Sequence, residues 1–432
     1  MEKFVIQGGV PLSGDLTVAG NKNAALPILA ACLLTEEELV LERVPRIRDT
    51  EAQLALLERL GVEVEWVADN SVRLCAAAVS DVSVDEELSK QIRASFLLAG
   101  PLLARFGEAR MPPPGGDFIG RRRLDAHLDA FADLGARVDG DRWIELSAPG
   151  DGLKPCAIFM DEPSVMGTEN ALMAAALTPG PTTISNAACE PHVQDLARLL
   201  SAMGAQVDGI GSNVMTVHGR DKLGGAEHRI GADHIEVGSF MALAAATGGE
   251  LRIRDTEPID LLMMRRQFRR LGLRSEVEGD DVIVPPGQRL HVQADLGDAI
   301  PKIEDGPWPA FPADLTSIAL ALATQADGEI LIFEKMFENR LFFVDKLVAM
   351  GARITLCDPH RAIVSGPSRL HGERVESPDI RAGMAMLIAA LAAEGVSEIG
   401  NIRQIDRGYE QIDVRLRGLG AQIERVSSEV PA

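Results

Sequence analysis

The sequence predicts an α/β protein of two domains, each built from three copies of one repeated unit. Three observations lead to this prediction. A helix–glycine–strand pattern recurs six times along the 432 residues. A segment rich in Ala and Leu precedes each copy of that pattern. The chain is also too long for a single ordinary domain.

The recurring pattern is an amphipathic stretch that ends in Leu or Met, followed by Gly and then by a strand-like segment. Glycine ends a helix readily because it adopts the left-handed conformation at low cost. The spacing between successive copies varies only from 68 to 79 residues, which is too regular for chance. The six glycines are Gly61, Gly135, Gly204, Gly272, Gly351 and Gly420.

The segments that precede the pattern carry small apolar residues on all sides, as in "GMAMLIAALAAEGVSEIGNI". A helix that is apolar all round is buried. Each unit should therefore contain one fully buried helix, one half-exposed helix and several strands. Six such units group most naturally into two sets of three, with the joint near residues 225–235.

Composition excludes several classes of function. The formal net charge of −21 argues against nucleic acid as a main partner, because phosphate backbones require a basic face. The longest apolar stretches reach roughly a dozen residues, whereas a membrane span needs about 20. The start of the chain has no signal-peptide core. Five cysteines without a CxxC pair fit reduced thiols in the cytoplasm, and eight scattered histidines give no metal-ligand spacing.

Charged or polar residues recur at the start of the buried helices. One such residue can simply cap its helix. Lysine or arginine at this place opposes the helix dipole, so these cations indicate an anionic ligand that shares the exposed N–H groups. The residues are Lys22, Asn23, Arg93, Thr168, Glu169, Glu236, Asp314, Asp379 and Arg381.

The loops after the following strands form a second equivalent position. They place Arg122, Arg340 and Arg407 in corresponding copies, with "PPPGGDFIGRRRLD" as the most basic loop. A solvated surface loop is the alternative interpretation of that segment alone. If the corresponding loops of the three units lie on one common face of each domain, the arginines can converge in a cleft between the domains. Guanidinium groups bind phosphate and carboxylate well, so the sequence predicts a ligand with both groups.

Seven segments resemble those of the enolpyruvyl transferases, and among these the UDP-N-acetylglucosamine 1-carboxyvinyltransferase family. They are "AGNKNAALPILAACLL", "IRASFLLAGPLLARFG", "PGGDFIGRRRLDAH", "FPADL", "FENRLF", "DIRAGM" and "IDRGYEQI". The resemblance implies a two-domain inside-out α/β barrel, with three repeats per domain and the helices facing inward. It implies domains at residues 22–231 and at residues 1–21 together with 232–432.

The implied reaction transfers enolpyruvyl from phosphoenolpyruvate to the 3′-hydroxyl of UDP-N-acetylglucosamine and releases phosphate. This is the first committed step of peptidoglycan precursor synthesis, and it needs no metal or redox cofactor. Addition of the hydroxyl builds positive character at the second carbon of phosphoenolpyruvate while the methylene takes a proton. A base at the hydroxyl and an acid near the methylene are therefore both required.

The resemblance also implies roles for particular residues. Lys22, Arg122 and Arg407 would hold the phosphate of phosphoenolpyruvate, and Arg381 with Arg407 its carboxylate. Asp314 would accept the proton of the attacking hydroxyl, and Arg340 would steady the closed cleft. The implied contacts to the sugar nucleotide are Asn23, Arg93, Arg122, Arg123, Leu124, Asp125, Ala126, Glu162, Pro163, Ser164, Val165, Asp314 and Met336.

Asp117 departs from the family pattern, which usually has a cysteine there as the proposed proton donor. A thiol is mostly protonated near pH 7, whereas a free aspartic acid is not. Asp117 is therefore expected to act as the donor only if its surroundings raise its pKa. Asp379 is the competing proton carrier. Fosfomycin alkylates the family's cysteine, so this chain should be insensitive to it.

Two departures concern the nucleotide. Some relatives have lysine at the position of Glu162 and proline at that of Arg123. The acid removes one possible phosphate contact, and the arginine can restore one. His127 and His192 are interpreted as surface or capping residues without a catalytic role.

Two alternative functions stay open. The same chemistry could use another acceptor, such as a different nucleotide or shikimate 3-phosphate. The chain could also be a catalytically silent protein that binds UDP-N-acetylglucosamine and regulates a partner. The presence of both the base Asp314 and the arginines for phosphoenolpyruvate favours an active enzyme. The sequence gives no indication of the oligomeric state.

Overall fold

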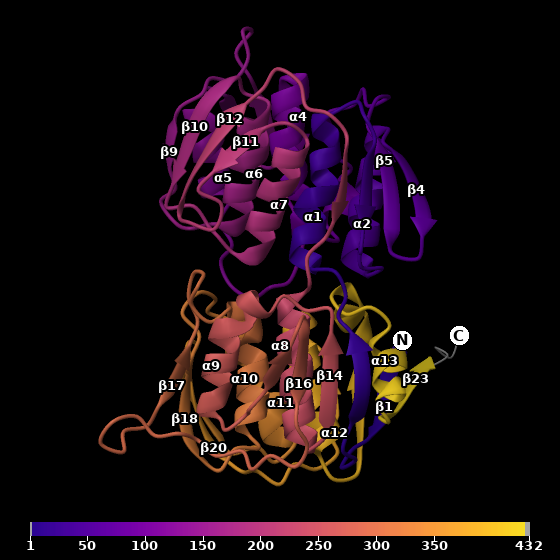
Figure 1. Cartoon of the computed structure of the whole chain (residues 1–432), viewed down its shortest axis with the longest axis vertical. Coiled ribbons are helices and arrows are strands. Elements are labelled where there is room, and N and C mark those ends of the chain that lie inside the picture. The colour runs from indigo at the N-terminus through magenta and orange to yellow at the C-terminus, as the bar shows by residue number, and fades with distance from the viewer. Residues whose placement is uncertain (1, 428–432) are drawn as a thin grey trace. The chain divides into compact units, whose positions relative to one another are not determined.

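The computed structural model describes residues 2–427. The described chain forms two compact units (Figure 1). The first unit contains residues 2–19, 118–121 and 232–427, and the second contains residues 20–117 and 122–231. The domains expected from the sequence differ from these units at residues 20–21 and at residues 118–121.

The second unit has three central helices, α1 (Lys22–Ala30), α4 (Ala99–Phe106) and α6 (Val165–Ala176). Three antiparallel or mixed sheets surround them. The first is β13 (Ala226–Arg229), β3 (Leu39–Glu42), β5 (Ser71–Cys75) and β4 (Glu63–Ala68). The second is β6 (Glu108–Met111), β8 (Ile144–Ser147) and β7 (Arg137–Asp139). The third is β11 (Gln206–Asp208), β12 (Val214–Gly219), β10 (Gly180–Ser185) and β9 (Ala157–Phe159).

The first unit repeats this plan around α8 (His234–Thr247), α10 (Thr316–Ala323) and α12 (Ile380–Ala392), which pack against one another. One sheet is β15 (Glu276–Glu278), β16 (Asp281–Val284), β14 (Glu250–Arg254) and β2 (Ser13–Thr17). Another is β17 (Lys302–Glu304), β18 (Gly328–Phe333), β20 (Arg361–Gly366) and β19 (Ile354–Asp358). The last is β21 (Arg374–Glu376), β22 (Val396–Gly400), β1 (Glu2–Gln7) and β23 (Gln422–Ser427).

The half-exposed helices are α2 (Arg48–Leu60), α5 (Asp125–Asp133), α7 (Pro191–Ala202), α9 (Leu262–Arg270), α11 (Val344–Ala349) and α13 (Ile412–Gly418). Each is followed by one of the six predicted glycines and then by a strand. All six glycines have positive φ values between 86° and 113°. The prediction that glycine ends these helices in the left-handed conformation is therefore confirmed.

The central helices are buried because their small side chains allow neighbours to approach on every side. In α12 all residues from Ile380 to Leu391 are buried. Each unit has its own continuous hydrophobic core, built mainly from Leu, Ile, Val, Ala and Met. Six predicted units, each with one buried and one half-exposed helix, are thus present.

The N-terminal strands complete the sheets of the first unit. Strand β1 lies between β22 and β23 and is antiparallel to both, with Phe4 opposite Ile399 and Arg425. Strand β2 pairs in parallel with β14. In the second unit β13 pairs in parallel with β3 in the same manner. The chain changes from one unit to the other at residues 19–20, 117–118, 121–122 and 231–232.

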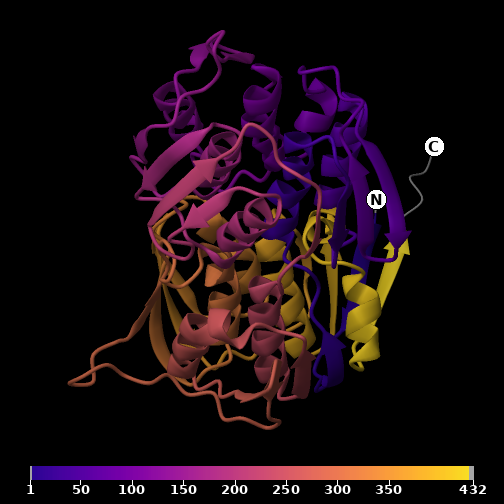
Figure 2. The ribbon, with the colours of Figure 1, turned by 45° about the horizontal axis from the view of Figure 1, so that its top comes forward.

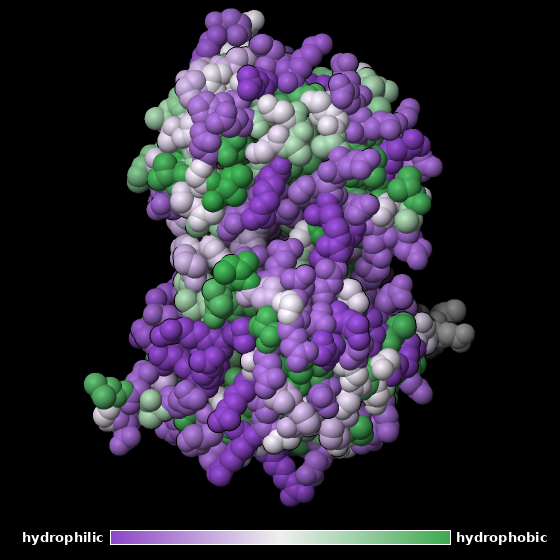
Figure 3. Space-filling model, in the orientation of Figure 1, coloured by the Kyte–Doolittle hydropathy of each residue, from purple (hydrophilic) through white to green (hydrophobic). Residues whose placement is uncertain are grey.

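An extended loop at residues 293–300 leaves the body of the first unit (Figures 1 and 2). Leu296 is fully exposed at this loop, and Figure 3 shows a hydrophobic group at its tip on an otherwise mainly hydrophilic face. No helix within residues 2–427 combines the length and apolar character needed to cross a membrane.

Candidate active site

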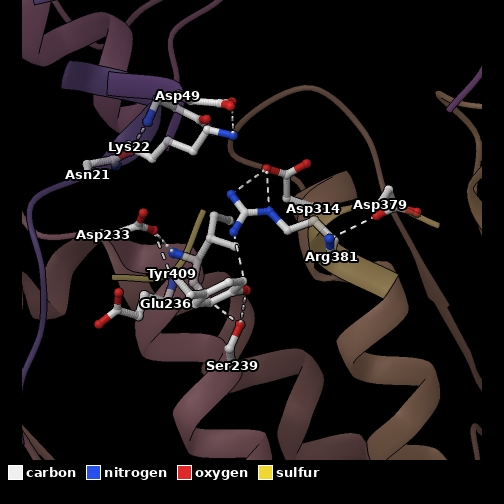
Figure 4. Close-up of polar contacts among 12 residues, drawn as sticks. Asn21, Lys22, Asp49, Asp233, Glu236, Ser239, Asp314, Asp379, Arg381 and Tyr409 are labelled. Carbon is white, nitrogen blue, oxygen red and sulfur yellow. Dashed lines mark hydrogen bonds and ion pairs between the residues drawn. The ribbon is translucent and has the colours of Figure 1, made fainter. Parts of the chain in front are cut away.

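The first unit holds Asp314 between two arginines, Arg340 and Arg381. Figure 4 shows its contact with Arg381. Asp314 lies in the short helix η4 (Ala313–Leu315), directly before α10. Its Oδ1 accepts a hydrogen bond from Arg340 Nη2 at 3.0 Å. Its Oδ2 accepts two from Arg381, from Nε at 3.1 Å and from Nη2 at 2.9 Å. Both arginines are buried, and together they occupy both oxygens of this carboxylate.

Tyr409 and Ser239 fix the other end of the Arg381 guanidinium. Arg381 Nη1 donates to the Tyr409 hydroxyl at 3.2 Å, and the guanidinium lies over the Tyr409 ring. Ser239 donates its own proton to the carbonyl of Ile235, so the Tyr409 O–H donates to Ser239 Oγ at 3.0 Å. Burial lowers the pKa of Arg381, but Asp314 outweighs this effect and the pKa is raised. Arg381 is therefore a rigid, permanently charged group.

Asp379 acts as the N-cap of α12. Its Oδ1 accepts hydrogen bonds from the backbone N–H groups of Arg381 at 2.8 Å and Ala382 at 2.9 Å. The sequence leaves two interpretations of Asp379 open, a competing proton carrier and a helix cap. The geometry gives this carboxylate the capping role.

Arg340 lies in η5 (Arg340–Phe343) and is almost completely buried. Its Nε is 3.7 Å from Glu334 Oε2, which is longer than a charge-assisted hydrogen bond. Burial raises the pKa of Glu334 to about 9, with Arg340 lowering it in part and the nearby Asp305 carboxylate adding to the rise. Glu334 is therefore a neutral acid near pH 7, and Asp314 is the anionic partner of Arg340.

Arg407 and Met336 have different surroundings. Arg407 ends the short helix η6 (Ile402–Arg407), is half-buried, and donates to Gln404 at 2.9 Å. The next residue, Gly408, lies so close to Ile380 that a Cβ would be 2.4 Å from it. This close approach brings Arg407 beside the start of α12. Met336 is partly exposed in the loop after β18.

In the second unit Lys22 begins α1 and forms a buried ion pair with Asp49 (Figure 4). The distance from Lys22 Nζ to Asp49 Oδ2 is 2.8 Å. Asp49 lies in the first turn of α2, where the helix dipole favours an anion. Asn21 caps α1 through its side-chain oxygen. Asn23 is half-buried in the first turn of α1.

Arg93 begins the short helix η2 (Arg93–Leu98) and points to the basic loop. Its Nη2 donates to the carbonyls of Arg122 and Arg123. Burial and the nearby cation of Arg122 lower the pKa of Arg93 to about 10. Within residues 2–427 Arg93 has no carboxylate partner. Two neighbouring cations of this kind suit a bound anion.

The glycines before Asp117 allow the loop to run against η2. Gly115 donates its N–H to the carbonyl of Ser89 at 3.0 Å. A Cβ at Gly115 would be 1.8 Å from the Lys90 carbonyl, and one at Gly116 would be 2.8 Å from Arg93 Cβ. The backbone of Gly116, which also has a φ of 104°, therefore fixes Asp117 close to Arg93.

Residues 118–121 of the same loop pack with the first unit. The backbone N–H of Asn339 donates to the Ile119 carbonyl at 3.0 Å. The N–H of Arg121 donates to Glu338 Oε1 at 2.9 Å. These contacts join the segment to the loop that carries Arg340.

The two predicted nucleotide loops lead into neighbouring helices. Residues 122–126 enter α5, residues 162–165 enter α6, and α5 packs against α6. Ser164 caps α6 by accepting from the N–H of Gly167 at 3.2 Å. Helix N-termini of this kind favour phosphate groups.

Arg123 is already engaged by a carboxylate. Its guanidinium donates twice to Asp125, at 2.8 and 2.6 Å. The hydrogen bond with Asp125 raises the pKa of Arg123, and the carboxylates of Asp161 and Glu162 add to that effect. The two loops are therefore electrostatically connected. The expectation that Arg123 supplies a phosphate contact requires it to exchange Asp125 for the ligand.

The sequence analysis missed several polar partners. Asp49 stands in the segment "VPRIRD", and Tyr409 is the only tyrosine in the chain, but no local pattern marks either residue. The interpretation of His127 and His192 as surface residues was wrong, because both side chains are buried. His127 Nδ1 lies 2.8 Å from Asn170 Nδ2 in α6. No group of three or more His, Cys, Asp or Glu side chains suited to a metal ion occurs among the described residues.

Comparisons with known proteins identify the family. The family model of EPSP synthase (3-phosphoshikimate 1-carboxyvinyltransferase) matches residues 6–416. The UDP-N-acetylglucosamine 1-carboxyvinyltransferase of Bradyrhizobium diazoefficiens is 57% identical, over 98% of both chains. The protein of the same name from Treponema denticola is 53% identical over 98% of this chain and 99% of its own.

Solved structures give the same fold. The enolpyruvyl transferase NikO from Streptomyces tendae matches with a TM-score of 0.87, at 25% identity and 99% coverage of both chains. The EPSP synthase of Acinetobacter baumannii matches with a TM-score of 0.75, at 18% identity, over 99% of this chain and 100% of that one. The predicted fold class and the predicted family are therefore confirmed.

Proposed function

Because the chain belongs to the UDP-N-acetylglucosamine 1-carboxyvinyltransferase family of enolpyruvyl transferases, we propose that it transfers enolpyruvyl from phosphoenolpyruvate to the 3′-hydroxyl of UDP-N-acetylglucosamine. Phosphate is the second product. One observation carries the proposal at the level of residues: Asp314 lies between two buried arginines, beside the start of a central helix. This group supplies both a base and binding sites for an anionic substrate.

The reaction proceeds by addition and elimination. In the addition, the sugar oxygen bonds to the second carbon of phosphoenolpyruvate, the hydroxyl proton leaves to a base, and the methylene carbon gains a proton. In the elimination, that carbon loses a proton and the bond to the phosphate oxygen breaks. The protein must therefore hold a base, an acid and a highly anionic substrate.

Asp314 is the proposed base. In the structure its carboxylate oxygens accept hydrogen bonds from Arg340 and Arg381. The carboxylate of phosphoenolpyruvate would compete for Arg381 and thereby release Asp314 Oδ2. Substrate binding and activation of the base are then one event. Arg340 keeps the Asp314 side chain in place by its hydrogen bond to Asp314 Oδ1.

Lys22, Arg122 and Arg407 are the proposed ligands of the phosphate. Lys22 is held by Asp49, and its ammonium group would share its N–H donors between this carboxylate and a phosphate oxygen. The charges of these residues stabilise the departing phosphate as its bond to carbon breaks. Arg407 would also help Arg381 to bind the carboxylate.

Asp117 is the proposed acid that protonates the methylene carbon. Its place beside Arg93 is set by Gly115 and Gly116. The multiple negative charges of the bound substrate favour a proton on this carboxyl and so offset the arginines. The capping role of Asp379 leaves Asp117 as the better candidate.

The loops at residues 122–126 and 162–165 are the proposed sites for the uridine and its phosphates. Both lead into helix N-termini, and Arg93 anchors the first loop by its carbonyls. Asn23 and Met336 complete the proposed contacts to the sugar nucleotide. The five free cysteines fit a cytoplasmic enzyme that acts early in peptidoglycan precursor synthesis.

Phosphate release from phosphoenolpyruvate tests the proposal. We expect release to require UDP-N-acetylglucosamine and to fall by roughly 10²–10⁴-fold in Asp314→Asn, the contribution of a positioned base. Asp327→Asn is the matched control, since Asp327 is an exposed residue of the same unit. Release with shikimate 3-phosphate instead would assign a different acceptor. Binding of UDP-N-acetylglucosamine without any release would assign a silent binding protein.

A further inference from the structure

We propose that Asn170 is a positioning residue for the nucleotide loop and acts by fixing the tautomer of His127. The inference rests on the proposed function, because residues 122–126 are the proposed nucleotide loop and His127 follows them directly. Neither residue was assigned a role above. Both are buried in the second unit, where α4, α5, α6 and η2 meet.

The orientation of the Asn170 amide is fixed by the backbone. Asn170 Oδ1 accepts a hydrogen bond from the N–H of Gly100 at 2.9 Å. Asn170 Nδ2 donates to the carbonyl of Phe96 at 2.9 Å. A backbone N–H can only donate and a carbonyl can only accept, so a rotated amide would lose both bonds. The second hydrogen of Nδ2 is then left for His127.

The tautomer of His127 follows from this orientation. Its Nδ1 lies 2.8 Å from Asn170 Nδ2, which presents a hydrogen there. Nδ1 must therefore carry a lone pair, and the proton of the neutral ring must be on Nε2. Burial and the nearby Arg93 lower the pKa of His127 to about 3, which agrees with a neutral ring.

The same contacts hold the first turn of α5. The His127 ring meets the edge of Phe96 at right angles, with 5.1 Å between the ring centres. Phe96 shares the short helix η2 with Arg93, which binds the carbonyls of Arg122 and Arg123. The nucleotide loop is therefore attached at both ends, by Arg93 at its start and by His127 at its end.

The close approach of α4 and α6 shows that this network is built into the core. A Cβ at Gly100 would be 2.7 Å from the Asn170 carbonyl oxygen and 2.8 Å from its Oδ1. Real Cβ atoms do not come so close, so glycine at position 100 is required for the Asn170 contact. All polar atoms of the Asn170 side chain are satisfied, as a buried amide requires.

Asn170→Asp is the decisive variant, because it keeps the shape of the side chain and replaces the donor with an acceptor. ¹⁵N NMR of histidine-labelled protein would report the tautomer, with His127→Gln identifying the signal. We expect wild type to show an unprotonated Nδ1 and a protonated Nε2, and the variant to show a protonated Nδ1. A protonated Nδ1 in wild type would overturn the tautomer assignment, whether or not the enzyme uses UDP-N-acetylglucosamine.

Kinetics test the positioning role. In Asn170→Asp we expect KM for UDP-N-acetylglucosamine to rise about tenfold, the loss expected for one buried hydrogen bond, while kcat and KM for phosphoenolpyruvate change less than about twofold. Asn70→Asp is the matched control, because Asn70 also donates its amide to a backbone carbonyl, at the turn between β4 and β5. An unchanged KM, or an equal loss in all three constants, would overturn the positioning role.

A double-mutant cycle tests whether Asn170 acts through His127. Asn170→Asp should have little further effect on KM when His127 is already Gln, because the two residues form one network. Additive effects of the two substitutions on KM would show that Asn170 does not act through His127. Failure of the wild type to use UDP-N-acetylglucosamine would contradict the proposed function but leave the NMR result intact.

Discussion

At the scale of single residues, charged candidate residues of each unit already have partners within that unit. Asp314 binds two arginines, and Lys22 binds Asp49. The sequence predicted the residue types but not these pairings. Lys22 and Asp49 are 27 positions apart on different helices, and only the packing of α1 against α2 brings them together. The sequence contains no local pattern that would have marked Asp49 or Tyr409.

Tyr409→Phe tests the support of Arg381. The variant leaves Arg381 Nη1 without its hydroxyl partner, so we expect a several-fold higher KM for phosphoenolpyruvate and a loss of about 1–3 kcal/mol in the free energy of unfolding. Steady-state kinetics and urea denaturation measure these effects. Ser239→Ala is the control, because it removes the other partner of the hydroxyl and leaves the Arg381 bond in place. Equal effects on KM in both variants would contradict the explanation.

The pKa of Glu334, raised by burial to about 9, makes stability depend on pH. The unfolded chain releases this proton near pH 4.5, whereas the folded protein keeps it up to about pH 9. The contribution of Glu334 to stability is therefore complete below pH 4.5 and is lost as the pH rises through 9, by up to about 1.4 kcal/mol per pH unit. We expect guanidinium denaturation at pH 6 and pH 8 to show this fall in wild type and a smaller one in Glu334→Gln. If the free energy of unfolding fell equally between pH 6 and pH 8 in both proteins, Glu334 would be ionised in the folded protein.

Position 117 decides the response to an epoxide drug. We expect wild type to keep its activity and mass after incubation with fosfomycin, because Asp117 replaces the thiol that the drug alkylates. Asp117→Cys should be inactivated over time and gain the mass of one fosfomycin. The wild-type protein also controls for alkylation of the other thiols, because it has five free cysteines, one of them exposed. Alkylation of wild type at Asp117 would refute the prediction.

At the scale of elements, the sequence predicted the repeat correctly because each unit carries its own local signals. A glycine in the left-handed conformation ends each outer helix, and a residue without Cβ is favoured there whatever the tertiary contacts are. The buried helices were predictable from small apolar residues on all sides. The pairing partners of each strand could not be predicted, because they depend on which units pack together.

Two of these glycines form a natural comparison. Gly204 has a φ of 113° and open space around its Cβ position, whereas Gly272 has a φ of 86° and a Cβ there would be 2.5 Å from the backbone N of His291. We expect Gly204→Ala to lose about 1–2 kcal/mol of unfolding free energy from backbone strain alone. Gly272→Ala should lose clearly more, because the backbone around His291 must also move. Urea denaturation of both variants provides the test, and equal losses would contradict it.

At the scale of the whole molecule, the chain order differs from the spatial order. Residues 2–17 form β1 and β2, which belong to the same unit as residues 232–427. Sequence patterns could mark β1 as a strand but not its place between β22 and β23, since both partners lie near the opposite end of the chain. The resemblance to the family, and not periodicity, suggested this arrangement.

This arrangement predicts how fragments behave. Phe4 and Ile6 are completely buried, and β1 is an inner strand, so a fragment of residues 232–432 lacks part of its core and the centre of one sheet. We expect this fragment to be unfolded or aggregated alone and to gain cooperative folding when a peptide of residues 1–19 is added, as followed by circular dichroism and urea denaturation. A peptide with Phe4→Asp and Ile6→Asp is the control and should not restore folding. A fragment that folds equally well without the peptide would show that β1 is not required for the core.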